Sequence, residues 1–342
     1  MHPLSTDLGT LLTDPHPGKL DVVDRVDVRT SLWHTLSAYH GVMTDELWPA
    51  LPYDAWKETY ATLHMWTQVV GKVALAQAPP VNHSWAIAMQ VTSRGLSTRA
   101  LPHGRRAFTI EFDFIDHTLT IRASDGAIRT MTLAPRSVAD FYRDVMGMLR
   151  DMALPVKIWP MPVEVESPIR FDQDTVHGSY DPTYANRCWR ILVQLERVFT
   201  GARCPFVGKC SPVHFFWGSF DLAVTRFSGK LAPPREGPAF MRDAYSHEVI
   251  SHGFWPGGRP LPEPVLYAYA VPEPPGLKEA PVEPAAAFYH RELGEFILPY
   301  EAVRSAADPE DAIGKFVDST YQQAATLAGW DRARLDRAPI LK

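Results

Sequence analysis

The chain has 342 residues, 46% of them hydrophobic and 21% charged, which excludes a disordered or fibrous protein. Its formal charge of -5 gives no basic surface for nucleic acid, and 31 prolines argue against a pure helix bundle. No signal-peptide pattern opens the chain, and no stretch approaches about 18 apolar residues. Three cysteines are too few for a disulfide framework. We therefore expect a soluble cytoplasmic protein with neither nucleic-acid nor membrane partners.

Helix candidates occur in two similar pairs along the chain. Each pair begins with a tryptophan-led segment that has apolar residues at helical spacing, over residues 56–70 and 189–199. The second member of the first pair, residues 137–150, opens with Ser137 and Asp140 at capping-box spacing. The second member of the other pair opens with the run from Asp308 to Asp311, which contains a cap residue, a proline and two acids. The order of elements therefore repeats.

Strand candidates lie between the two helices of each pair. The spacing from Pro80 to Pro212 equals the spacing from Trp85 to Trp217, as expected for an internal duplication. One extra residue in the second copy, at Gly218, predicts a β-bulge that re-aims the side chains after it. Further strand patterns follow in both halves. The proline-bounded strands are expected over residues 79–91 and 211–224.

The pattern predicts an α+β fold that is internally duplicated, with two helix-covered antiparallel sheets about a pseudo-twofold axis. Residues 1–55 are expected to form an N-terminal cap segment, residues 56–185 the first repeat with a connector, and residues 186–342 the second repeat. A long insertion is expected at 229–262. The crevice between the repeats becomes the expected site. Alternatively, the duplication supplies only a large core.

Several strings along the chain resemble a family of uncharacterised bacterial proteins, domain of unknown function number 5996. The strings include PPVNHSW, LAPRSVADFY, HGSYDP, AYSHEVISHGFWPGG and, most specifically, SPVHFFWGSFDLAVTRFSG. The resemblance covers about Trp56 to Trp330, nearly the whole chain. It implies a bacterial, soluble, single-chain protein and carries no reaction.

Histidines are the first candidates for chemistry, because a neutral imidazole binds metals and titrates near working pH. His83 and His214 each follow a Pro-Val pair at the start of an expected strand. His177 lies in a turn before the second tryptophan-led helix, from which it could reach the crevice. The alternative for His83 and His214 is a packed imidazole with one backbone hydrogen bond.

The insertion supplies a second group of candidates. His247 and His252 are five residues apart, so they would not share a helix face and the HExxH zinc motif is rejected. Glu248 with His252 is the better local pair. A long loop containing Phe254 and Trp255 is too aromatic for a solvated linker, so it either builds the site or only plugs the crevice.

Asp221 and Arg226 follow His214 in the expected strand. Strict alternation places His214 with Arg226, whereas the bulge would bring His214 and Asp221 to one side. Asp221 would then orient the imidazole for metal binding or general-base work. The alternative is an Asp221–Arg226 ion pair within the sheet.

The leading hypothesis is a metal-dependent or histidine-based enzyme that acts on a small molecule in the inter-repeat crevice. Zn²⁺ or Fe²⁺ suits imidazole and carboxylate ligands, and the lack of phosphate-loop motifs argues against a nucleotide cofactor. A non-catalytic binding protein with an aromatic pocket is the runner-up, and an assembly protein the third hypothesis. The candidate residues are Glu248 and Asp221 for catalysis; Trp85, Trp217, Arg226, Phe254 and Trp255 for substrate; and His83, His177, His214 and His247 for metal.

Overall fold

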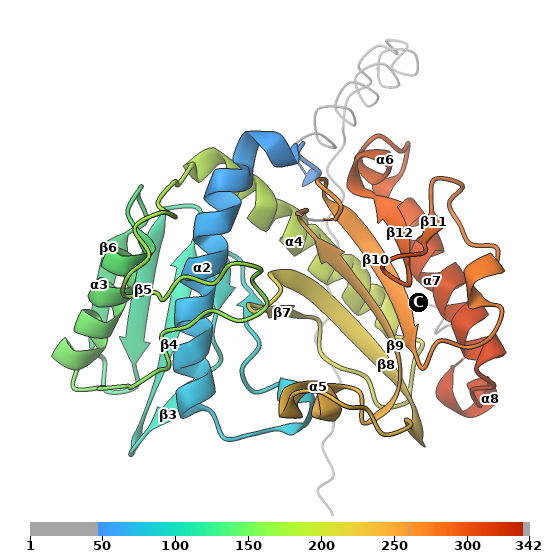
Figure 1. Cartoon of the computed structure of the whole chain (residues 1–342), viewed down its shortest axis with the longest axis horizontal. Helices are drawn as coiled ribbons and strands as arrows, with labels where there is room; N and C mark the ends of the chain where they lie inside the picture. The colour runs from blue at the N-terminus through green and yellow to red at the C-terminus, as the bar shows by residue number, and fades with distance from the viewer. Residues whose placement is uncertain (1–46, 259, 338–342) are drawn as a thin grey trace, which may run out of the picture. The chain divides into compact units, whose positions relative to one another are not determined.

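The computed structural model describes residues 47–258 and 260–337, so most of the expected N-terminal cap segment lies outside the described residues. The described chain has an α+β fold with two six-stranded antiparallel sheets and seven α-helices (Figure 1). None of these helices combines the length and the apolar content needed to cross a membrane.

The first sheet has the order β1-β2-β4-β5-β6, with β3 pairing with β4. Its residues come from the first half of the chain. The strands are β1 (Gln90–Val91), β2 (Gly95–Ser97), β3 (Leu101–His103), β4 (Arg106–Asp113), β5 (Thr118–Ala123) and β6 (Ile128–Thr132).

The second sheet has the order β11-β12-β10-β9-β8-β7. Its strands β8 and β9 are the longest in the described chain. The strands are β7 (His214–Phe216), β8 (Asp221–Leu231), β9 (His247–Trp255), β10 (Val265–Val271), β11 (Phe288–His290) and β12 (Glu295–Pro299).

Two helices, α2 (Tyr53–Gln77) and α3 (Val138–Asp151), pack beside each other against the first sheet (Figure 1). The ring of Trp66 on α2 stacks on Phe141 of α3, with centroids 4.6 Å apart, and Phe141 in turn stacks on Phe112 of β4. Ser137 caps α3 by accepting a hydrogen bond from the Asp140 backbone, which confirms the capped helix expected there. The buried rings therefore join helices and sheet in one core.

The second sheet is covered on one face by α4 (Pro182–Arg203) and α7 (Pro309–Leu327). Asp308 accepts hydrogen bonds from two backbone N–H groups and a proline follows it, so the expected start of α7 is confirmed. Alternate residues of β8, among them Leu222 and Val224, are fully buried. Two short helices, α6 (Tyr300–Arg304) and α8 (Arg332–Leu335), flank α7.

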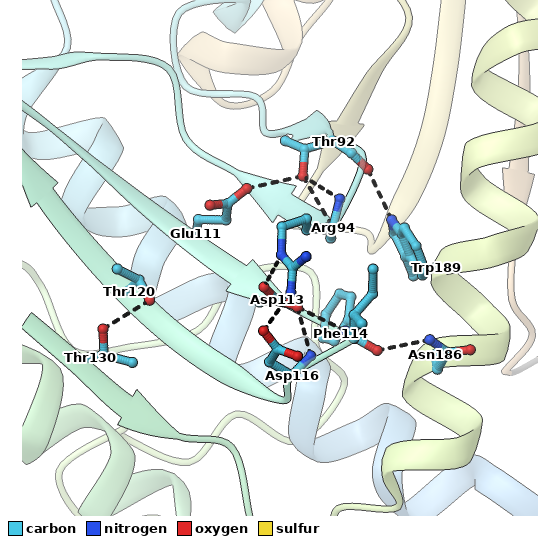
Figure 2. Close-up of polar contacts among 12 residues, drawn as sticks. Thr92, Arg94, Glu111, Asp113, Phe114, Asp116, Thr120, Thr130, Asn186 and Trp189 are labelled. Carbon is cyan, nitrogen blue, oxygen red and sulfur yellow. Dashed lines mark hydrogen bonds and ion pairs between the residues drawn. The ribbon is translucent and has the colours of Figure 1, made fainter.

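Helix α4 also contacts the first sheet (Figure 2). The Trp189 indole donates to the carbonyl of Thr92 at 3.0 Å, and the Asn186 amide donates to the carbonyl of Phe114 at 2.9 Å (Figure 2). Beside these contacts, Arg94 forms an ion pair with Asp116 at 2.6 Å. One helix is thus anchored to both sheets.

The prediction of a single proline-bounded strand over residues 211–224 is wrong, because the chain reverses direction within this segment. Residues 217–220 form the turn between β7 and β8, so Gly218 lies in a hairpin turn rather than in a bulge. The turn is fixed by the Gly218 carbonyl, which accepts from Nε2 of His64 at 2.7 Å. It is also fixed by Phe220, whose left-handed φ of 57° is held by packing against Tyr60.

The strand expected over residues 79–91 is also mostly absent. Asn82–Ser84 form a short 3-10 turn, η1, and only Gln90–Val91 belong to a strand. The cause is local, since His83 and Ser84 both adopt left-handed backbone conformations that a strand does not allow. Trp85 lies in the turn after η1 and Trp217 in the turn between β7 and β8, so neither tryptophan lies in the strand expected for it.

Candidate functional site

A cavity of about 660 Å³ lies on the face of the second sheet opposite α4 and α7. Side chains alternate along a strand, so the odd-numbered residues of β8 line the cavity while the even-numbered ones face the helices. The cavity floor consists of Asp221, Ala223, Thr225 and Phe227 from β8, Val249 and Ser251 from β9, Tyr267 and Tyr269 from β10, and Glu295 and Ile297 from β12.

Segments outside the sheet complete the cavity walls. Helix α5 (Ala239–Ala244) lies within the expected insertion, packs against η1 and contributes Met241 and Ala244 to the lining. The same insertion adds Tyr245, Trp255, Pro260 and Leu261. The connector between α3 and α4 adds Val163 and Glu164. The insertion therefore folds against the cavity.

Asp221 is the most deeply placed acid of the cavity. It is 8% exposed and accepts hydrogen bonds from the hydroxyls of Ser219 and Tyr267. Burial raises the pKa of the Asp221 carboxyl, while both hydroxyls counteract this by stabilising the carboxylate. The Tyr267 side chain reaches Asp221 across Gly253 of β9, where a Cβ atom would clash with the phenol ring.

A row of tyrosines continues from Asp221 towards Glu295. The rings of Tyr267 and Tyr269 stack with centroids 5.9 Å apart, and the Tyr269 hydroxyl lies 3.1 Å from the hydroxyl of Tyr245. Burial and the neighbouring Asp221 raise the pKa of Glu295 to about 7. A carboxyl that titrates near neutral pH can donate or accept a proton there.

His83 is held in a defined orientation at the other side of the cavity. Its backbone N–H donates to Asp243 at 2.6 Å, and the Lys209 ammonium donates to its Nε2 atom at 2.7 Å. An ammonium group has no acceptor, so Nε2 must accept and the ring proton of neutral His83 lies on Nδ1. That Nδ1 atom is buried without a partner among the described residues. Burial and Lys209 both lower the pKa of His83, which favours the neutral ring.

His214 is 3% exposed and lines the cavity from β7. Within the described part of the chain, neither of its ring nitrogens has a hydrogen-bond partner. Burial lowers its pKa to about 4, so the ring is neutral at pH 7. His214 pairs with Ala223 across the hairpin and so shares a face with Asp221. Arg226 lies on the opposite face, so the placement of His214 beside Arg226 that strict alternation predicted is wrong.

Several expected site residues lie away from the cavity. His177 bonds Asp174 at 2.7 Å, and Phe254 is fully buried against Tyr300 on the helix-covered face. The Arg226 guanidinium lies 4.5 Å from the Tyr321 ring centroid and donates to the carbonyl of Ala202, so the alternative Asp221–Arg226 ion pair is also wrong.

The two remaining expected residues, His247 and Glu248, begin β9 and are not part of the cavity lining. His247 contacts the site only indirectly, with its ring centroid 6.0 Å from that of His83. Glu248 is 4.0 Å from the Lys230 ammonium. Across residues 47–258 and 260–337, no group of three or more His, Cys, Asp or Glu side chains is arranged to hold a metal ion. The four histidines expected to bind metal do not form such a group, and binding of Zn²⁺ or Fe²⁺ stays a prediction.

A family model described as DUF5996, a family of unknown function, matches residues 48–337. The chain belongs to this family. The comparison with curated proteins and the comparison with solved structures each give no match.

The DUF5996 region contains cavity residues that the sequence patterns above did not single out. Tyr267 and Tyr269 alternate with alanines in VLYAYAV, a pattern that places both rings on one strand face. Glu295 is the only charged residue of the strand EFILP, and a lone acid in an apolar strand is a usable signal. Glu164 lines the cavity and Lys209 contacts the cavity residue His83, but both lie in irregular segments and have no such signal.

Proposed function

We propose that this protein binds a small organic molecule in the cavity on the second sheet. The observation that carries the proposal is the cavity itself, about 660 Å³ in volume and lined by aromatic rings with a few inward polar groups. Small-molecule sites commonly fall between about 300 and 1,000 Å³ and have this composition. Trp85, Trp217 and Trp255 supply apolar surface, and His83, His214 and Asp221 supply polar atoms.

A fluorescent probe tests the proposal directly. N-phenyl-1-naphthylamine is weakly emissive in water and brightens in an apolar cavity, so we expect saturable enhancement with the full chain. Ala223 lies on the cavity floor, and Ala223→Trp fills the space above it. The variant should lose the enhancement and retain its circular dichroism spectrum. Ala307→Trp, at an exposed position, is the matched control. Equal enhancement in both variants would contradict the proposal.

An acid–base enzyme is the second candidate function, and the pair of Asp221 and Glu295 favours it. Asp221 is held by two hydroxyl donors, whereas Glu295 titrates near neutral pH in the same cavity. Two carboxyls with different environments can divide the roles of base and acid. Neutral His214 would hydrogen-bond the substrate. Mass spectrometry of a cavity ligand incubated with the protein, and with Asp221→Asn, separates binding from turnover.

We also propose that the two sheets arose by internal duplication, in a register different from the one set by the tryptophans. In each half the strand order runs outward from the junction, from β1 to β6 and from β7 to β12, apart from the positions of β3 and β11. A long helix precedes and another helix follows each sheet in the chain. Superposition of β1–β2 on β7–β8 tests this, and unrelated positions for α2 and α4 would contradict it.

A further inference from the structure

Three carboxyl groups line the same cavity and lack ion-pair partners. Asp221, Glu164 and Glu295 all belong to the lining, and in the part of the chain that the structure describes none of them forms an ion pair with lysine or arginine. Burial raises the pKa of both glutamates, and the neighbouring Asp221 raises it further. The charged form of these carboxyls is therefore disfavoured by burial and by their mutual repulsion, and a bound cation would stabilise it.

Aromatic rings adjoin these carboxyls. Tyr267 is hydrogen-bonded to Asp221, Tyr269 stacks on Tyr267, and Tyr245 closes the row from the insertion. Trp255 belongs to the same lining. The face of an aromatic ring attracts a cation, and rings combined with carboxylates form the typical site for an alkylated or aryl-alkyl ammonium group.

A second observation points to a ligand independently of the acids. His214 is 3% exposed and lines the cavity, yet neither of its ring nitrogens has a hydrogen-bond partner among the described residues. Nδ1 of His83 is buried and equally unpartnered. Buried polar atoms normally have a partner, so a ligand hydroxyl or carbonyl group would satisfy them.

We propose that the ligand is an organic cation, a protonated or alkylated amine with a polar group elsewhere on its skeleton. This rests on the proposed small-molecule function. The ammonium group lies beside the carboxylates of Asp221 and Glu295 against the tyrosine row, and the polar group contacts His214 or His83. Lys209 does not oppose this placement, because its ammonium group is directed to Nε2 of His83 and it is not part of the lining.

Three indoles that differ in charge test the proposal by competition against N-phenyl-1-naphthylamine. Tryptamine carries an ammonium group, tryptophol a hydroxyl and indole-3-acetate a carboxylate on the same ring system. We expect tryptamine to displace the probe at a concentration about tenfold or more below tryptophol, and indole-3-acetate to be the weakest. Tetraethylammonium should also compete, since it carries charge without a hydrogen-bond donor.

Two variants test whether the carboxyl groups cause the preference for cations. Glu295→Gln and Asp221→Asn keep the side-chain shape, and each should reduce tryptamine competition about tenfold while leaving tryptophol nearly unchanged. Glu166→Gln, at an exposed position outside the cavity, should alter neither. If Asp221→Asn does not fold, Glu295→Gln alone decides. Tryptamine binding at pH 7 should also release protons from Glu295, measured calorimetrically in two buffers of different ionisation enthalpy.

The outcomes separate this proposal from the one on which it rests. Saturable probe enhancement without any preference of the cations over tryptophol overturns the cation proposal and leaves the small-molecule function standing. Preference for indole-3-acetate also overturns it and indicates an anionic ligand. Failure of the probe to bind, with Ala223→Trp unchanged from the native chain, overturns both.

Discussion

The hydroxyl of Tyr267 donates to Asp221 across Gly253, and only a glycine on β9 leaves room for this crossing. An alanine Cβ at that position would lie under 3.0 Å from the Tyr267 phenol, a separation that real Cβ contacts essentially never show. Residues of three strands, β8, β9 and β10, therefore determine the position of this one hydrogen bond in the cavity.

Gly253→Ala should displace the Tyr267 ring and weaken N-phenyl-1-naphthylamine binding. Overpacking of a buried site typically costs about 1–3 kcal/mol, which urea denaturation would measure as a lower free energy of unfolding. Tyr267→Phe is the control, because it removes the same hydrogen bond without the clash. A Gly253→Ala protein as stable as the native chain would show that the ring can move freely.

The stability of the protein should depend on pH through Glu295. Its pKa is about 7 in the folded chain and near 4.5 in the unfolded chain, so the unfolded state loses its proton first. The free energy of unfolding contributed by Glu295 therefore falls as pH rises from about 4.5 to about 7. Its partial exposure keeps the slope below about 1.4 kcal/mol per pH unit.

Glu295→Gln removes this titration and should be more stable than the native chain at pH 8, with little difference at pH 4.5. The comparison of two proteins at each pH cancels His214, whose lowered pKa gives a slope of opposite sign. Chemical denaturation at four pH values provides the measurement. If the free energies of unfolding of the two proteins change with pH in parallel, Glu295 keeps an ordinary pKa.

Gly71→Ala tests how α2 supports the cavity wall. A Cβ atom at residue 71 would lie under 3.0 Å from the ring of Trp217, which lines the cavity and donates from its indole to the Ile87 carbonyl at 3.0 Å. We expect about 1–3 kcal/mol lower stability and weaker probe binding. Gly201→Ala, in α4 with no atom near its Cβ position, is the matched control and should be neutral or stabilising.

His177 should matter for stability and not for binding. It partners Asp174, whose side chain is fully buried, and it lies outside the cavity lining. His177→Ala leaves a buried carboxylate with fewer donors, at a cost of about 1–3 kcal/mol. Probe affinity should stay within twofold of the native value. A large loss of probe affinity with unchanged stability would instead indicate that His177 belongs to the binding site.

Local signals in the sequence predicted the helices well. The caps at Ser137 and Asp308 are short-range hydrogen bonds between neighbours in the chain, so the sequence alone contains them. The strand expected over residues 211–224 failed because its reversal depends on long-range contacts. The Gly218 carbonyl is bonded by His64, more than a hundred residues earlier, and Phe220 packs against Tyr60.

Residues of the candidate site were predicted correctly only where the residue type itself suggests a buried or functional position. His83, His214, Asp221 and three of the tryptophans were singled out and line the cavity. Phe254 was placed wrongly because adjacent residues of a strand face opposite sides, and no local signal tells which of Phe254 and Trp255 faces inward. Glu164 was missed because its position depends on the path of a connector without regular structure.

Met89 and Phe215 exchange two backbone hydrogen bonds of 2.8 Å, which join the innermost strands of the two sheets. Strands β1 and β7 therefore do not present a free edge at this point, and such edges are templates for edge-to-edge association between chains. The remaining described edges at β3 and β11 are three residues long, and β6 carries Arg129 near its exposed end. A substitution that breaks the Met89–Phe215 bridge, such as Met89→Pro, would expose unpaired strands and promote aggregation before it alters any cavity residue.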